Sequence, residues 1–310
     1  MKNDIRHTSS KHVNPFKETE DPVDKVTEQG AIDVAALAFV KQLGVELQKG
    51  EFDLPPFPDT ALKVQECIRD PAADNQSLAA IIATEPALAA RLMRMANSAM
   101  MRRGPIEVTD IPTAISRVGM TMVQNAATSF AAREAFKVPV GSACFGELNN
   151  LRRMSVSVAA IAYLLAKNVR SIRKPDEAML AGLLSCVGKF YIFTKAADHP
   201  ELFTDREALN SLIPRWHTGV AHAIVESWQF PDTIAGAVDE QEVKERDRAE
   251  PADLSDLLLI ANIIARAGVK AAEQLGELDS LARMRMDAGK LHTLLQENEE
   301  EIQSLVSAMT

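Results

Sequence analysis

The stretch ATEPALAARLMRMANSAMM at residues 83–101 decides the fold class, because its apolar residues follow the spacing of an amphipathic α-helix. Pro86 lies in the first turn of this helix, where its missing N–H would have no intrahelical partner. Such a helix buries its apolar face against other elements. This face is formed by Leu88, Leu92, Met95, Ala96 and Ala99.

The same spacing extends along the chain on both sides of this stretch. No run alternates apolar and polar residues as a strand does, and the chain has only two Tyr and two Trp, so a sheet is not expected. The sequence therefore predicts an all-α fold. Helices are expected at 32–50, from about Asp59, after a cap at Asn75 or Ser77, from Asp110 to Gly119, at 121–130, around 154–165, at 175–184, at 213–228, at 231–238, at 254–267 and at about 279–307.

The expected helices divide into two lobes. Residues 137–147 mix Pro, Gly and Ser with few periodic positions, which marks a break. We expect an N-terminal helical lobe at 31–140 and a second lobe at 141–250, with C-terminal helices at 251–310 that pack on the second lobe. Residues 1–30 are polar and charged, so they predict a flexible tail.

The composition restricts the partners. The 310 residues include 34 Lys+Arg and 43 Asp+Glu, for a formal net charge of -9. This balance lacks the positive field that binds nucleic-acid backbones, so nucleic acid is not an expected partner. The three cysteines show no spacing typical of a metal site or of paired disulfides. Without an apolar leader or a long apolar run, we expect a cytoplasmic protein that does not bind a membrane.

Five segments occur in a characteristic order. Together they resemble the HDOD family, a helical regulatory domain of bacterial signalling proteins that is related to the His-Asp metal phosphohydrolases. The resemblance covers roughly residues 50 to 250 and implies a two-lobed helical bundle, its second lobe a degenerate HD-like bundle. The segments are LPPFP (54–58), ATEPALAARLMRMANSAMM (83–101), AISRVGM (114–120), AGLLSCVGK (181–189) and HTGVAHAIVESWQFPD (217–232).

An active His-Asp phosphohydrolase gathers imidazoles and carboxylates around divalent cations that activate a water. In this chain the resemblance leaves only one histidine, His217, at a place where many relatives have one. We therefore expect no bound metal, no cofactor and no catalytic residue. The corresponding positions are Met154, Ser185, Cys186, His217, Gln241 and Glu242.

The neighbours of these positions favour structural roles. Met154 lies on an apolar helical stripe and is expected in the core, whereas Glu242 is taken as exposed. Cys186 has apolar neighbours, so we expect a buried thiol with a raised pKa. A nucleophilic or redox-sensing Cys186, with His217 as its base, is the alternative. His217 and His222 are five residues apart, about 140° around a helix, and do not share a face.

Two further pairs of motif residues each have a structural and a ligand-binding interpretation. Gly188 and Lys189 are expected at a helix C-terminus, where Lys189 complements the helix dipole or contacts an anion. Asn97 and Ser98 end a helix, and Asn97 is expected to bond the loop at 102–108 or to adopt a left-handed conformation. We favour a lock on the fold over a ligand contact.

Other residues extend the list of structural or interaction candidates. Trp228 and Pro231 belong to the motif WQFP and are expected to be structural or to contact a partner. Four arginines lie within or directly after residues 83–101. They form either an anion-binding surface or, as we favour, a solvated helix face. These are Arg91, Arg94, Arg102 and Arg103.

The sequence thus predicts a non-catalytic signal-transduction module that binds a signalling protein or a small regulator. The alternative is a metal-dependent phosphohydrolase or cyclic-nucleotide phosphodiesterase of the HD superfamily with altered ligands. That activity requires at least three metal donors, which the sequence does not place together. The identity of the partner, the input signal and the oligomeric state are left open.

Overall fold

The computed structural model describes residues 57–102, 104–199, 201–204 and 206–310, with short pieces between 38 and 46. Every regular element in these residues is a helix, which confirms the predicted all-α fold. The pieces between 38 and 46 are helical too. The predicted tail, and most of the helix predicted at 32–50, lie outside the described residues.

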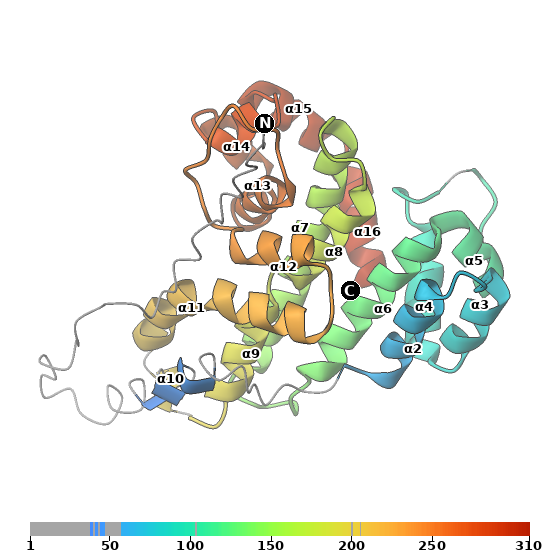
Figure 1. Ribbon diagram of the computed structural model, residues 1–310, viewed down its shortest axis with the longest axis horizontal. Coiled ribbons are helices and arrows are strands. Elements are labelled where there is room, and N and C mark those ends of the chain that lie inside the picture. The colour runs from blue at the N-terminus through green and yellow to red at the C-terminus, as the bar shows by residue number, and fades with distance from the viewer. Residues whose placement is uncertain are drawn as a thin grey trace, which may run out of the picture.

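A first group of helices is drawn from blue to green in Figure 1. As predicted, Pro86 opens one helix, and Gly119, with a φ of 90°, ends the next. The predicted cap at Asn75 or Ser77 is wrong, because the carboxylate of Asp74 accepts the hydrogen bonds from the first turn. The helices are α2 (Asp59–Arg69), α3 (Asn75–Ala83), α4 (Pro86–Asn97), α5 (Ile111–Val118) and α6 (Met120–Ala135).

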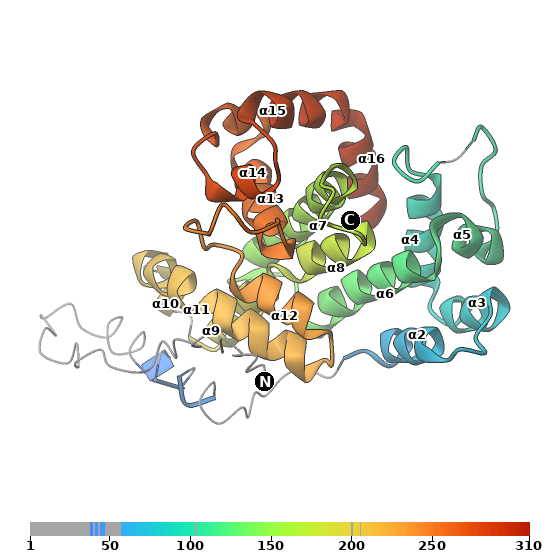
Figure 2. The same cartoon turned by 45° about the horizontal axis from the view of Figure 1, so that its top comes forward.

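A second group surrounds two helices, α7 and α8, that lie side by side at the centre of the molecule (Figures 1 and 2). Helix α6 of the first group packs on α8, so one apolar core continues through both groups. Helix α11 begins upstream of the predicted residue 213 and continues through Pro214. The helices are α7 (Phe145–Asn168), α8 (Pro175–Leu184), α9 (Val187–Ala196), α10 (Glu201–Thr204), α11 (Arg206–Ser227) and α12 (Asp232–Asp239).

The C-terminal part is more interrupted than its apolar spacing predicts. Where the sequence suggests helical structure from about 279 to 307, the chain leaves the helix at Arg285, which has a φ of 55°, and again at Asn298. Asn298 donates its side-chain N–H to the Leu294 carbonyl and so ends its helix. The elements are α13 (Leu254–Ala267), η2 (Val269–Gln274), α14 (Asp279–Arg283), α15 (Ala288–Glu297) and α16 (Glu299–Met309).

Helix α16 packs on both groups of helices. It lies against α7 of the second group and α4 of the first (Figures 1 and 2). Arg94 on α4 donates to the Ala308 carbonyl at 3.2 Å, and the Ser304 hydroxyl accepts from the Ala99 N–H at 2.9 Å. Helix α16 therefore contacts the first group of helices as well as the second, on which the sequence placed the C-terminal helices.

Aromatic rings join the LPPFP and WQFP motifs. The ring of Phe57 lies 5.1 Å from that of Trp228 and 6.1 Å from that of Phe230, measured between centroids. Arg69 also donates to the carbonyl of Gln229 at 3.1 Å, and Gln229 has a φ of 58°. Trp228 thus has a structural role, because its ring packs against a segment that is distant in the sequence.

Two glycines of the AGLLSCVGK motif allow helix backbones to touch. A Cβ on Gly182 would lie 2.4 Å from the Cα of Ala159 on α7. A Cβ on Gly188 would lie 2.0 Å from the carbonyl oxygen of His217 on α11. Both neighbours are backbone atoms within helices, so neither can move aside as the end of a side chain could.

We predict that Gly188→Ala destabilises the protein by more than about 2 kcal/mol, because α9 and α11 must separate to admit the methyl group. Chemical denaturation gives the free energy of unfolding directly. Gly219→Ala on α11 is the matched control, since its Cβ would meet nothing within 4 Å. That change should stabilise the helix by about 0.5–1 kcal/mol. Equal effects of the two substitutions would contradict the close contact.

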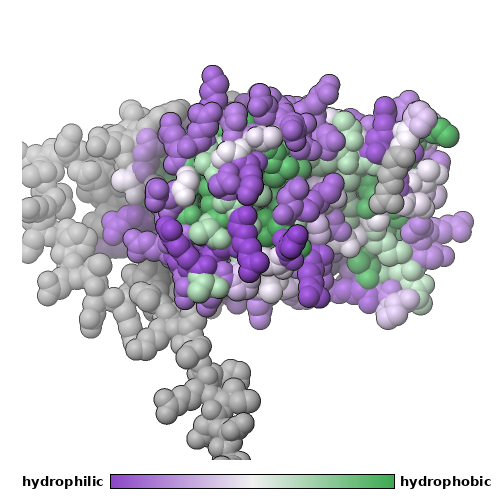
Figure 3. Space-filling model, turned by 90° about the horizontal axis from the view of Figure 1, so that it is seen from above, coloured by the Kyte–Doolittle hydropathy of each residue, from purple (hydrophilic) through white to green (hydrophobic). Residues whose placement is uncertain are grey.

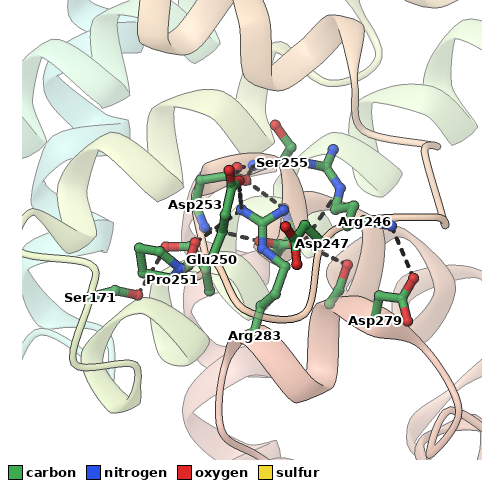
Figure 4. Close-up of polar contacts among 12 residues, drawn as sticks. Ser171, Arg246, Asp247, Glu250, Pro251, Asp253, Ser255, Asp279 and Arg283 are labelled. Carbon is green, nitrogen blue, oxygen red and sulfur yellow. Dashed lines mark hydrogen bonds and ion pairs between the residues drawn. The ribbon is translucent and has the colours of Figure 1, made fainter.

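An ionic network holds α13 and α14 to the loop after α12 (Figure 4). The carboxylate of Asp256 is fully buried, 3.1 Å from Nε of Arg283 and 3.5 Å from Nε of Arg246. Asp256 also accepts the Ser280 hydroxyl at 2.7 Å and the Asp253 N–H at 3.0 Å. Both arginine side chains are at most 6% exposed. Asp253, which is 47% exposed, contacts both of them as well, at 3.0 Å from Arg283 and 3.5 Å from Arg246, so Asp256 is their fully buried carboxylate partner rather than their sole one.

Asp256→Asn should therefore cost about 3–5 kcal/mol, because it leaves two buried guanidinium groups with less negative charge than they need. Thermal or urea unfolding measures this loss. Glu250→Gln alters a carboxylate 3.8 Å from Arg283 that is 66% exposed, and serves as the control. The control should change stability by less than about 0.5 kcal/mol. A loss of stability below about 1 kcal/mol in Asp256→Asn would show that the network is not needed.

One long apolar region of the sequence lies in the interior of the protein. Residues 175–196, which include α8 and α9, are the one described segment long and apolar enough to cross a membrane, and 78% of its most apolar part is buried inside the protein. Packing in the core accounts for this composition. On the face shown in Figure 3, charged and polar side chains predominate and apolar ones lie between them.

Candidate functional site

The turn between α8 and α9 forms the centre of the candidate site. Ser185 and Cys186 occupy this turn and are each 1% exposed. The Ser185 hydroxyl donates to the Gly182 carbonyl at 2.7 Å, which closes the end of α8. Burial raises the pKa of the Cys186 thiol, as expected, and Lys189 opposes this shift. The thiol is thus an enclosed, protonated side chain.

His217 on α11 faces Glu242, the residue after the buried Gln241. Its Nε2 lies 3.0 Å from Oε1 of Glu242, and the imidazole is 1% exposed. Burial lowers the pKa of His217, whereas the hydrogen bond to Glu242 opposes the shift. The imidazole therefore stays neutral at pH 7, with Nε2 turned toward the carboxylate.

Two cations contact the same carboxylate oxygen. Nη2 of Arg266 lies 3.1 Å from Oε1 of Glu242, and Nζ of Lys189 lies 3.8 Å from it. The His217 hydrogen bond, followed by these charges, lowers the pKa of Glu242 to about 2. The expectation of an exposed Glu242 is therefore wrong, because the carboxylate is half-buried at the centre of a charged cluster. We call His217, Glu242, Lys189 and Arg266 the Glu242 cluster.

Gln241 is bonded within the protein on both sides of its amide. Its Nε2 donates to the carbonyls of Ser185 at 3.1 Å and Val238 at 2.7 Å. Its Oε1 accepts from Nδ2 of Asn262 at 3.0 Å. The amide thereby ties the turn after α8 to α12 and α13, and its donors and acceptor are used in this role.

Met154 departs from its predicted position in the core. It lies on α7, where it is only partly buried and packs against the margin of the core. It is thus less enclosed than Ser185, Cys186, His217 and Gln241, which are all buried. The side chain adds apolar contact area, and its thioether is a poor ligand for hard divalent cations.

Lys189 is placed differently from the sequence prediction. Gly188 and Lys189 lie in the first turn of α9, at the start of a helix rather than at its end. Dipole complementation does not explain Lys189, because the N-terminal end of a helix disfavours a cation. Its pKa is lowered by burial, and its contact with Glu242 compensates the charge.

Asn97 locks a loop, as the sequence predicted. Its Oδ1 accepts from the Val108 N–H at 2.8 Å, and its Nδ2 donates to the Val108 carbonyl at 2.9 Å. Ser98 is buried and donates to the Met95 carbonyl. Pro231 precedes α12 as its N-cap. His222 is a half-buried residue whose Nδ1 lies 3.2 Å from the Ala235 carbonyl.

The donor set does not fit a divalent cation. Among the described residues, no three His, Cys, Asp or Glu side chains lie together in a way that could hold a metal. Glu242 is the one carboxylate of the cluster, and two protein cations contact it. A divalent cation at this carboxylate would lie beside Lys189 and Arg266, and their positive charges would repel it.

Sequence reasoning missed the two residues that α13 contributes. Arg266 is in the last turn of its helix, where a basic residue also complements the dipole. Asn262 is one turn earlier and 4% exposed. Their spacing of four residues places both on one face, but only the packing of α13 shows that this face meets Gln241 and Glu242.

Comparison with known proteins identifies the family. The family model described as HDOD domain matches residues 54–243. The chain belongs to the HDOD domain family. The match covers every residue of the Glu242 cluster except Arg266, which lies on the later helix α13.

Solved structures share the HDOD fold of this chain. A Shewanella amazonensis SB2B protein, provisionally named a metal-dependent phosphohydrolase, has a TM-score of 0.72, 24% identity and coverage of 89% of this chain and 100% of its own. An HDOD domain protein of unknown function from Geobacter sulfurreducens has a TM-score of 0.66, 20% identity and coverage of 90% and 99%. These identities establish the fold alone.

Two further relatives extend the comparison. A Marinobacter aquaeolei VT8 protein, provisionally named a signal transduction protein, has a TM-score of 0.58 and 20% identity, over 88% of this chain and 66% of its own. An uncharacterised Treponema pallidum protein is 24% identical over 198 residues, or 60% of this chain. The HDOD chain spans only 37% of the length of that relative.

The charge of Glu242 should make stability depend on pH in a defined direction. Because its pKa falls from the ordinary 4.5 to about 2 in the folded protein, its contribution is present above pH 4.5 and is lost as the pH falls toward 2. Glu242→Gln should cost about 1–2 kcal/mol at pH 7, after allowance for solvent screening at this half-buried site.

Urea unfolding at pH 7, 5 and 4 tests this dependence. The difference between parent and Glu242→Gln should be largest at pH 7 and smaller at pH 4, because the unfolded chain takes up a proton at this carboxyl. Glu245→Gln changes an exposed carboxylate three residues away and should have little effect. A constant difference at all three pH values would argue against a charged Glu242.

Proposed function

We propose that this HDOD protein is a non-catalytic regulatory module in bacterial signalling, one that responds to a partner protein or a small regulator. The observation that carries the proposal is the contact of Lys189 and Arg266 with Glu242. At the position where the related phosphohydrolases present metal ligands, this chain has an internally compensated ion cluster. Such a cluster stabilises helix packing and provides no open coordination site.

The enclosed state of the neighbouring groups supports the same proposal. A nucleophile must be accessible and activated, but burial keeps the Cys186 thiol protonated. A general base must reach its substrate, but the His217 imidazole is 1% exposed and turned toward Glu242. A role in signalling is also in keeping with the provisional name of the Marinobacter protein.

We predict that the purified full chain carries much less than one Fe, Mn or Zn per molecule and does not hydrolyse phosphodiesters. Elemental analysis measures the metal, and release of nitrophenol from bis-p-nitrophenyl phosphate in Mn²⁺ or Mg²⁺ measures the activity. The physical reason is that Met154, Ser185 and Cys186 supply neither an imidazole nor a carboxylate as a metal ligand.

A stoichiometric metal together with hydrolysis that chelation abolishes would favour the alternative, an HD-type phosphohydrolase with altered ligands. Met154→His provides a second check, because a lone imidazole should gain no metal-dependent stability. Its melting temperature should therefore be the same with and without Mn²⁺. An increase of several degrees with Mn²⁺ would show that the remaining groups do complete a site.

The proposed partner is tested separately by affinity capture from the native cell with the full chain as bait. A protein that co-purifies with the parent, and binds it directly when both are purified, supports the module. Recovery of no directly binding protein or small molecule would contradict the partner-binding part of the proposal.

A further inference from the structure

A cavity of about 450 Å³ lies where α4, α6, α7 and the end of α16 meet. It is thus at the junction between the two groups of helices. Its lining contains five basic side chains and one acidic one. The apolar residues Phe145, Val156, Leu183 and Phe190 form other parts of the wall. The basic residues are Arg91, Arg133, Lys137, Arg152 and Arg153, and the acidic residue is Glu134.

Arg91 is a buried cation without a carboxylate partner in the described part of the protein. It is 3% exposed, and Nη1 donates to the Ser129 hydroxyl at 3.1 Å. Burial, with Arg133 and Arg94 nearby, lowers its pKa to about 10, a value at which it still carries its charge at pH 7. The prediction of a solvated helix face is therefore wrong for Arg91. A buried charge is costly unless an anion compensates it.

Arg152 is the second incompletely used guanidinium in the wall. It donates to Oδ1 of Asn149 at 2.8 Å and to the Phe136 carbonyl at 3.0 Å. Its Nε is buried and has no acceptor among the described residues. Burial and Arg133 lower the pKa of Arg152, so this side chain also lies close to other positive charge.

The acid in the wall is already committed to other cations. Glu134 lies 3.8 Å from Nε of Arg133 and 3.4 Å from Nζ of Lys137. Arg133 also donates to the Thr310 carbonyl at 3.4 Å. These contacts partly compensate Arg133 and Lys137, but they leave Arg91 and Arg152 without a direct carboxylate contact.

We propose that this cavity binds a small organic phosphate, with its anionic group on Arg91 and Arg152 and its apolar or aromatic part against Phe145 and Phe190. A guanidinium group can bind two oxygens of one phosphate at once, and the wall of this cavity contains two incompletely used guanidinium groups, those of Arg91 and Arg152. The volume is within the range of about 300–1,000 Å³ that small-molecule sites occupy, and it suits a ligand of nucleotide size.

The position of the cavity gives such a ligand a regulatory role. Arg91 is on α4, Arg152 is on α7, and both are held near α6 and α16. An anion that contacts both arginines would favour one arrangement of the two groups of helices over others. This consequence rests on the proposed regulatory function, whereas binding itself does not depend on it.

Isothermal titration calorimetry on the full chain at low salt tests the site, with inorganic phosphate, pyrophosphate and AMP as probes and adenosine as the uncharged control. At least one anionic probe should bind at one molecule per chain. Adenosine should bind at least ten-fold more weakly than AMP, and added NaCl should weaken the anionic binding.

Arg91→Met should weaken this binding at least ten-fold. It should also leave the melting temperature of the ligand-free protein unchanged or raised, because it removes a charge that lacks a partner. Arg102→Met changes an exposed arginine outside the cavity and is the matched control, with binding as in the parent. Arg153→Met, at an exposed position in the lining, should fold normally and give a smaller loss of affinity.

Three results would overturn the proposal: no saturable binding of any anionic probe, binding that Arg91→Met leaves intact, or equal affinity for adenosine and AMP. A large drop in the melting temperature of ligand-free Arg91→Met would also count against it, since Arg91 would then be a structural residue. Metal content and hydrolysis are measured on the same preparation, so failure of the non-catalytic proposal is seen independently of failure of this site.

Discussion

Direct contact between helix backbones at Gly182 and Gly188 determines the arrangement of the second lobe. These glycines bring α8 against α7 and α9 against α11 with no side chain between them. The turn that contains Ser185 and Cys186 is consequently enclosed on several sides, and the His217 backbone lies against α9. Packing at this distance tolerates no side chain at either glycine position.

The same packing explains why the Glu242 cluster is ionic. With α9 so close to α11, Lys189 at the start of α9 reaches the carboxylate that His217 also contacts. Arg266 approaches from α13. Lys189 loses solvation through burial, and Glu242 restores a favourable environment for its charge. The cluster therefore joins α9, α11 and α13 through one side chain.

The local features of this fold could be predicted from the sequence. Pro86 and Gly119 gave correct helix boundaries, the 254–267 helix was correct at both ends, and Asn97 was correctly expected to bond the following loop. Each of these depends on residues close together in the chain, and backbone hydrogen-bonding rules act at that range. The all-α class followed in the same way from apolar periodicity.

Some errors are local, such as the Asp74 cap and the turn that places Lys189 at the start of a helix. Other errors concern contacts between distant residues. Glu242 was expected in solvent, because nothing near it in the sequence shows that α13 covers this region. Arg91 was taken as a surface residue for the same reason, since its burial depends on α6, α7 and α16. Charge on a helix is usually solvated, so a buried arginine or a compensated glutamate is visible only after the helices are packed.

The most direct test of the central claim is titration of the full chain with Mn²⁺ at pH 7, with free Mn²⁺ followed by electron paramagnetic resonance. The account predicts that the signal rises as in buffer alone, in both the parent and Glu242→Gln, because Lys189 and Arg266 already compensate the carboxylate. Saturable loss of the free-ion signal at one Mn²⁺ per chain in the parent, and none in Glu242→Gln, would contradict the account and place a metal site at this carboxylate.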